Sequence, residues 1–219
     1  MKPDARLSIH PHLLLPHNFA RLASMRQASI ERNTAETKIK LSINLDGSGK
    51  GNINTGIGFF DHMLTLFAKH GCFDLDVHVD GDLHIDGHHT IEDTGIVLGD
   101  AIREALGDKI GIFRYGHAYV PMDETLTRTV IDLSNRPYLD LRAPDNVPDA
   151  PNMVFSLTEE FLRAIANNLR CNLHTEVMYG RDGHHVAESI FKSLARALRF
   201  ACAQDPLMAG QLPSTKDKL

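Results

Sequence analysis

The chain has 219 residues, which is enough for one large domain or for two closely packed halves. Hydrophobic residues make up 42% of the chain, so a sizeable core is expected. No apolar run approaches the ~20 residues of a membrane-spanning helix. The formal net charge of −5 disfavours general attraction to nucleic acid or to an anionic membrane surface. Basic groups that bind a ligand are therefore expected to be local.

The cysteines and the N-terminal segment bear on the cellular compartment. Cys72, Cys171 and Cys202 are an odd number without metal-ligand spacing, so we expect free thiols and a reducing cytoplasm. Residues 1–25 hold only three consecutive leucines, too few for a signal-peptide core, and are interpreted as a disordered extension. A weak targeting segment is the alternative for residues 1–25.

Taken in chain order, the predicted elements occur twice. Residues 35–49 and 123–137 align with each other and alternate as strands do. Residues 59–79 align with 157–177, each with helical spacing that turns into a short strand. Helices are then predicted over 94–109 and 187–201. The expected fold is α+β, with two duplicated halves in one domain, each a small β-sheet with helices on one face.

The boundaries of these parts follow from the repeat. We expect a first half over 26–112 and a second half over 113–205, followed by a C-terminal tail over 206–219. Each half carries one copy of the pattern His-His-x-x-Glu, as His88, His89 and Glu92 and then as His184, His185 and Glu188. A pattern that recurs at the same place in a larger repeat is stronger evidence than a lone histidine pair.

The spacing of this pattern predicts metal binding. In a helix, residues i and i+4 share a face, so His88 and Glu92 can converge on one point, while His89 is turned ~100° away. Imidazole and carboxylate ligands without thiolate suit manganese, iron or zinc. His62 and Glu160 occupy matching positions on the preceding helices and are candidate further ligands. Core packing is the alternative for His62, and a solvated helix face is the alternative for Glu160.

Six ordered motifs support a family assignment. They read "GIGFFDHML", "GDLHIDGHHTIEDTGIVLG", "RYGHAYVPMDET", "DLSNRPYL", "YGRDGHHVAESIFKSLARALR" and "LPSTKDKL". From about Arg26 to the C-terminus, the chain resembles the imidazoleglycerol-phosphate dehydratase family. The resemblance implies removal of water from D-erythro-imidazole-glycerol phosphate, giving imidazole-acetol phosphate in histidine biosynthesis. It also implies two Mn²⁺ ions per active site and a homo-oligomer of 24 subunits built from trimers, with active sites at subunit boundaries.

The resemblance also implies roles for individual residues. The metal ligands are His62, His88, His89, Glu92, Glu160, His184, His185 and Glu188, where the family can have histidine at the position of Glu160. Glu36 is the expected catalytic proton shuttle. The expected substrate contacts are Glu36, His62, His88, Glu92, Arg114, Arg136, His184, Glu188, Lys192, Ser214, Thr215 and Lys216. Those expected chiefly around the phosphate are Arg114, Arg136, Lys192, Ser214, Thr215 and Lys216.

Two other functions fit parts of the pattern. A dinuclear phosphatase or hydrolase would use a similar metal pair, but such sites rely more on aspartate than on imidazole. A metal-assembled scaffold without catalysis would need the histidines but not the basic residues. The substrate that the resemblance implies has an imidazole ring with two similar nitrogens, which suits a site with two similar metals.

Overall fold

The computed structural model describes residues 26–216 and 218–219, so the extension expected over 1–25 lies outside the described residues. The elements of the first half are β1 (Gln27–Asn33), β2 (Thr37–Asn44), β3 (Gly51–Asn54), α1 (Gly58–Gly71), β4 (Asp74–Gly81) and α2 (His88–Leu106). Those of the second half are β5 (Tyr115–Met122), β6 (Thr125–Asp132), β7 (Tyr138–Arg142), α3 (Phe155–Leu169), β8 (Asn172–Tyr179) and α4 (Gly183–Cys202), and a short 3-10 helix, Pro206–Met208, follows. The order of elements is the same in both halves.

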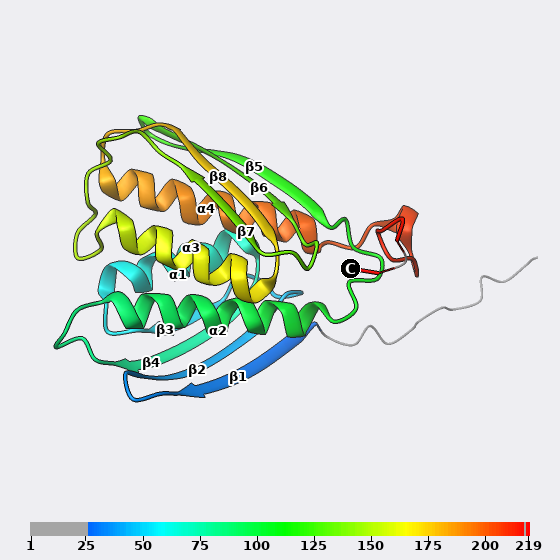
Figure 1. The fold of residues 1–219 in the computed structure, drawn as a ribbon, viewed down its shortest axis with the longest axis horizontal. Helices are drawn as coiled ribbons and strands as arrows, with labels where there is room; N and C mark the ends of the chain where they lie inside the picture. Colours follow the sequence, from blue (N-terminus) through cyan, green and yellow to red (C-terminus); the bar gives the residue numbers. More distant parts are fainter. Residues whose placement is uncertain (1–25, 217) are drawn as a thin grey trace, which may run out of the picture.

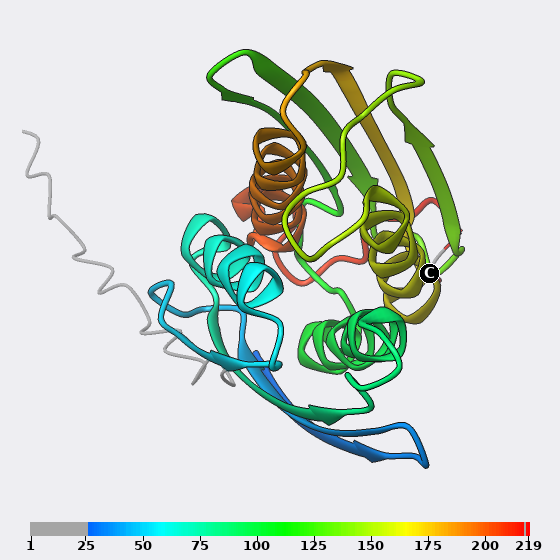
Figure 2. The ribbon, with the colours of Figure 1, turned by 90° about the vertical axis from the view of Figure 1, so that its left-hand side faces the viewer.

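Each half forms one four-stranded mixed sheet. The strand orders are β1-β2-β4-β3 and β5-β6-β8-β7, which are equivalent positions in the two halves. In each sheet the last strand of the order pairs in parallel and the other pairs are antiparallel. Figures 1 and 2 show the four helices lying between the two sheets. The predicted α+β fold, duplicated with helices on one face of each sheet, is confirmed.

Side-chain alternation explains why each sheet buries one face. In β2 the buried residues are Thr37, Ile39, Leu41 and Ile43, with lysines and serine between them. Successive side chains of a strand point to opposite faces, so this pattern places one face on the helices and one in solvent. The equivalent strand β6 repeats the alternation.

The helices pair across the two halves. Helix α1 packs on α4, and α2 packs on α3, so each pair joins one helix from each half. Two glycines allow the close approach of α2 and α3. A Cβ atom on Gly95 would lie 3.0 Å from the backbone oxygen of Phe161, and one on Gly99 would lie 3.0 Å from the backbone nitrogen of Leu169. Larger residues at these positions would push the two halves apart.

One core therefore serves both halves. The rings of Phe60, Phe161 and Phe191 are fully buried and come from α1, α3 and α4. Phe161 stacks on Phe191 at 4.9 Å between centroids, and Phe60 meets Phe161 edge-on at 5.3 Å. Within the described residues, no helix has the length and apolar character needed to cross a membrane.

Candidate metal centre and substrate site

Both His-His-x-x-Glu patterns form the first turn of a helix. In α2, His88 Nε2 lies 3.5 Å from Glu92 Oε2, and in α4, His184 Nε2 lies 3.2 Å from Glu188 Oε2. Each turn is fixed by an aspartate just before it. Asp86 accepts a hydrogen bond from the backbone of His88, and Asp182 accepts one from the backbone of His185. The first histidine and the glutamate of each pattern thus share a helix face, as the spacing predicts.

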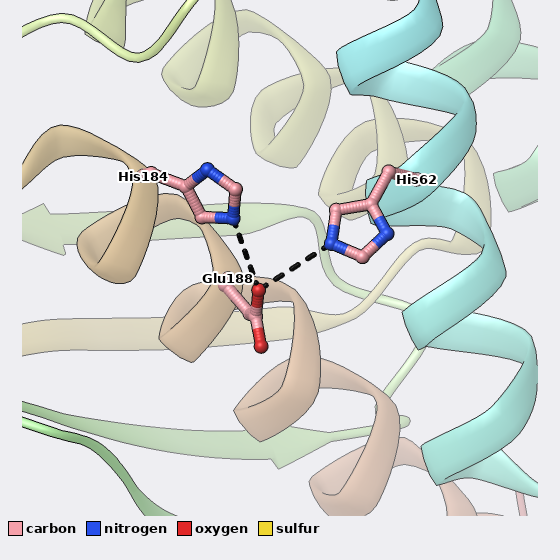
Figure 3. Close-up of side chains that lie close together, drawn as sticks. All are labelled: His62, His184 and Glu188. Carbon is pink, nitrogen blue, oxygen red and sulfur yellow. Dashed lines mark hydrogen bonds and ion pairs between the residues drawn. The ribbon is translucent and has the colours of Figure 1, made fainter.

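A group of three potential ligands forms between α1 and α4. Glu188 Oε2 lies 3.2 Å from His184 Nε2 and 3.4 Å from His62 Nε2, and the three ligand atoms are all within 4.8 Å of one another. Figure 3 shows both rings directed at the same carboxylate. The glutamate side chain is only 9% exposed, whereas the two rings remain accessible. His62 thus joins the pattern of the other half rather than that of its own.

Lys192 contacts this group. Its ammonium pairs with Glu188 Oε1 and lies 3.7 Å from Met122 Sδ. Burial alone would raise the pKa of Glu188, but hydrogen bonds from Lys192 and the two histidines bring the pKa below the ordinary value for glutamate. The carboxylate is therefore ionised and ready to bind a cation. Lys192 was expected near the phosphate, but among the described residues its side chain contacts Glu188 and Met122.

The matching group in the other helix pair is less complete. His88 and Glu92 face each other, but Glu160 on α3 has its contact with Arg163, whose Nε lies 3.9 Å from Glu160 Oε2. The described part of the chain holds one group of three or more potential ligand side chains, and Glu160 is not in it. The two pairs of helices are thus equivalent in position but not in the ligands they bring together.

The second histidine of each pattern faces a different carboxylate. His89 Nδ1 lies 2.9 Å from Asp82 Oδ2, and His185 Nδ1 lies 2.7 Å from Glu124 Oε2. The hydrogen bond to Asp82 raises the pKa of His89, and the one to Glu124 raises the pKa of His185. Glu36, the expected proton shuttle, lies on the other side of His89, with Oε1 3.8 Å from Nε2.

A basic pocket forms at the start of the second half. Arg114 is buried and bidentate on Asp132, with distances of 2.7 and 3.1 Å, and it donates to the carbonyl of Pro213 at 2.8 Å. Arg136 Nη2 lies 3.5 Å from Asp132 Oδ2. An open pocket of about 710 Å³ is lined by Arg114, Tyr115, Met208, Gln211, Leu212, Pro213, Ser214 and Thr215. Four of the expected phosphate contacts therefore lie near one another: Arg114, Arg136, Ser214 and Thr215.

The C-terminal tail is held in place at this pocket. Ser214 Oγ donates to the carbonyl of Lys218 at 2.8 Å and accepts from the backbone of Lys216 at 3.2 Å. The Lys216 side chain is exposed. The hydroxyl of Ser214 and the Arg114 guanidinium are thus brought together by a tail that the chain folds back over the second half.

Three carboxylates at these sites were not predicted from the sequence. Asp132 holds two arginines, and Asp82 and Glu124 hold two histidines. Glu124 had a signal, because it aligns with Glu36 in the repeat. The contact of Asp132 depends on tertiary structure, and the sequence carries no sign of it.

The metal group and the basic pocket lie at opposite ends of α4. His184 and Glu188 are in its first two turns, whereas the backbone of Arg114 binds the carbonyl of Ala201 in its last turn. Ala201 follows Glu188 by thirteen residues, which is about 20 Å along a helix that rises ~1.5 Å per residue. Figure 1 shows the C-terminal tail beyond the same end of α4.

Fold and site together define an internally duplicated α+β protein with a histidine and glutamate centre shared between its halves. The family model for imidazoleglycerol-phosphate dehydratase matches residues 55–198. The chain belongs to the imidazoleglycerol-phosphate dehydratase family. It is accordingly a hydro-lyase of histidine biosynthesis.

Relatives and solved structures agree on this family. Imidazoleglycerol-phosphate dehydratase of Akkermansia muciniphila is 62% identical over 89% of this chain and 100% of its own length. That of Azorhizobium caulinodans is 56% identical over 89% and 99%. The crystal structure of the Pyrococcus furiosus protein, in complex with (S)-C348, has a TM-score of 0.74 at 37% identity and covers 87% of this chain and 100% of that one. The Staphylococcus aureus structure has a TM-score of 0.73 at 39% identity and covers 81% and 99%.

Proposed function

We propose that the protein dehydrates D-erythro-imidazole-glycerol phosphate to imidazole-acetol phosphate with two Mn²⁺ ions in each active site. The group of His62, His184 and Glu188 carries this proposal. Its three ligand atoms lie within 4.8 Å of one another and combine imidazole with carboxylate, a donor set that fits Mn²⁺. The second ion would be held by the repeat-equivalent group of His88 and Glu92, with Glu160 as a further ligand. His89 and His185 would each present a nitrogen to a metal as well.

The chain's own residues would bind the imidazole ring and move a proton. Bound Mn²⁺ would supply positive charge that stabilises negative charge on the ring while water is lost. The proton shuttle we propose is Glu36, whose carboxylate is about half exposed and lies beside the free side of His89. A positioned acid or base of this kind typically contributes ~10²–10⁴-fold to the rate.

The separation of the two groups supports a site shared between chains. In the substrate, three carbons separate the imidazole ring from the phosphate, which is far too short to bridge about 20 Å of helix. We therefore propose that the metal centre of one subunit, with Lys192 beside it, faces the other phosphate-binding residues in a neighbour: Arg114, Arg136, Ser214, Thr215 and Lys216. A homo-oligomer of 24 subunits built from trimers would meet this need. The free thiols of all three cysteines favour a cytoplasmic location.

The first experiment tests the reaction and the role of Glu36. Purified protein with Mn²⁺ is expected to convert the imidazole substrate to the dehydrated ketone, and chelation of the metal is expected to abolish turnover. Glu36→Gln should lower kcat at least tenfold and leave the bound manganese unchanged. The control is Glu31→Gln, since Glu31 is an exposed strand residue that contacts Lys40. Release of inorganic phosphate in place of the ketone would favour a phosphatase, and metal uptake without turnover would favour a scaffold.

A second experiment tests the shared site. Glu188→Gln removes a metal ligand, whereas Arg136→Ala removes a phosphate contact. If each active site takes these groups from different subunits, mixed assemblies of the two inactive variants contain some sites with neither change. Activity should then reappear after the variants are unfolded and refolded together. If the mixture stays as inactive as its components, the site is contained in one chain.

A further inference from the structure

The carboxylates that bind Nδ1 of His89 and of His185 come from different positions in the two halves. Asp82 directly follows β4, whereas Glu124 lies in the turn between β5 and β6. Each accepts a hydrogen bond from Nδ1, at 2.9 Å for Asp82 and 2.7 Å for Glu124. When a carboxylate holds the proton on Nδ1, the lone pair remains on Nε2, which is the nitrogen left to bind a metal.

The contacts of Glu124 hold its carboxylate in one orientation. Oε1 accepts hydrogen bonds from the backbone of Asp182 at 3.1 Å and of Arg181 at 3.4 Å, and from Thr125 Oγ1 at 3.2 Å. Oε2 is thereby left for His185. The carboxylate is thus fixed by three contacts on one oxygen and by His185 on the other.

Asp82 makes fewer side-chain hydrogen bonds than Glu124 does. Its Oδ2 accepts from His89, but its buried Oδ1 has no hydrogen-bond partner among the described residues. A buried carboxylate oxygen without a partner costs stability, so the hydrogen bond from His89 is the favourable polar contact that this side chain makes among the described residues. This hydrogen bond orients the ring of His89.

The repeat shows that the two halves have exchanged this role between positions. Glu36 and Glu124 are equivalent, because each precedes the threonine that begins β2 or β6. Glu124 binds Nδ1 of its histidine, but Glu36 lies 3.8 Å from the opposite nitrogen, Nε2 of His89. Asp82 occupies the Nδ1 side in the first half and leaves Glu36 free.

The position equivalent to Asp82 in the second half is Arg181. Gly81, just before Asp82, pairs with Thr37, and Gly180, just before Arg181, lies against Thr125. An arginine has no acceptor for Nδ1–H, so the second half needs its glutamate for that contact. Each half therefore has one carboxylate that accepts from Nδ1 of its histidine. In the first half it follows β4, and in the second half it precedes β6.

We propose that Asp82 and Glu124 are positioning residues that orient His89 and His185 to bind metal through Nε2, and that Asp82 frees Glu36 to meet the substrate. The inference rests on the proposed manganese-dependent function. It assigns different roles to two glutamates that the duplication made equivalent. Glu36 lies near Nε2 of His89, on the side where the metal and substrate would bind, whereas Glu124 binds Nδ1 of His185 on the opposite side of its ring.

The test measures Mn²⁺ affinity of the full-length assembled protein, with free Mn²⁺ followed by electron paramagnetic resonance. Wild type should bind two ions per chain. Asp82→Asn and Glu124→Gln should each weaken one of these two sites ~10–100-fold, the loss typical when the hydrogen-bond partner of a ligand is removed. The matched control is Asp80→Asn, because Asp80 is two residues from Asp82 and only faces Lys38 at the surface.

A compensating change separates positioning from general damage. Arg181→Asp places an acid at the position of Asp82 in the second half, and it should restore Mn²⁺ affinity in the Glu124→Gln background. A merely structural loss would not be repaired in this way. If both single variants bind two ions as wild type does, the positioning role is overturned. If Arg181→Asp restores nothing, the exchange between positions is overturned. If wild type itself binds no Mn²⁺, the proposed function is what fails.

Discussion

Lys109 is expected to make a contribution to the stability of this protein that rises with pH in the alkaline range. It lies between α2 and β5 and is only 3% exposed. Its ammonium donates to the carbonyl of Leu133 at 3.1 Å and to Asn135 Oδ1 at 2.7 Å, both of them uncharged acceptors. Burial is the largest cause that lowers the pKa of Lys109 to about 8. These contacts hold the turn that presents Arg136.

The sign and size of the effect follow from this pKa. In the unfolded chain the amine has its ordinary pKa of 10.5, so between pH 8 and 10.5 the unfolded state binds more protons than the folded state. The contribution of Lys109 to the free energy of unfolding must then rise with pH, while below pH 8 the cost of the buried charge is fully present. The difference of about 2.5 pH units corresponds to roughly 3 kcal/mol, at ~1.4 kcal/mol per unit.

The assay is urea unfolding followed by far-ultraviolet circular dichroism, with chelator present, from pH 7.5 to 10.5. Lys109→Met removes the titrating group, so the difference in unfolding free energy between wild type and variant should shift by roughly 3 kcal/mol in favour of wild type as the pH rises. Lys38→Met is the control, because Lys38 is largely exposed. The reasoning is refuted if the Lys109→Met curve runs parallel to that of wild type across this range.

Two further changes test the core and the metal centre. Phe161→Ala should lower the unfolding free energy by ~3–5 kcal/mol, because it empties a fully buried position stacked on Phe191; urea unfolding measures the loss. Glu188→Gln should release more manganese on dialysis than Glu160→Gln does, since Glu188 already faces two histidines and Glu160 faces only Arg163. Equal manganese contents in the two variants, measured by elemental analysis, would contradict that difference.

The elements that the sequence predicted are those with strong local signals. Alternation identified the strands at β2 and β6, and helical spacing followed by alternation identified α1 with β4 and α3 with β8. Each of these patterns occurs twice in the chain, which distinguishes it from a chance match. Strands β1 and β5 were not predicted, and neither were the short parallel strands β3 and β7. The latter two are four and five residues long, and their backbone hydrogen bonds, which no local pattern encodes, define them.

The sequence could identify candidate ligands but not their partners. The spacing in α4 placed His184 beside Glu188, because that relation is set by the helix itself. It could not place His62 beside them, since this contact depends on how α1 packs against a helix from the other half. The carboxylate behind His89 was missed for a similar reason. Asp82 reaches the ring only because a loop of six residues returns the chain to it.

The exchange of partners between the halves explains why duplication produced a site that neither half has alone. A single half contains a His-His-x-x-Glu turn and, on its other helix, His62 or Glu160. In this fold each of those helices packs mainly on a helix of the other half: α1 packs on α4, and α2 packs on α3. A ligand group of three therefore needs both halves folded together, as the group of His62, His184 and Glu188 shows. The site that we propose between subunits has the same dependence. The basic pocket lies about 20 Å along α4 from the metal group, and under that proposal a small substrate reaches both only when two subunits meet.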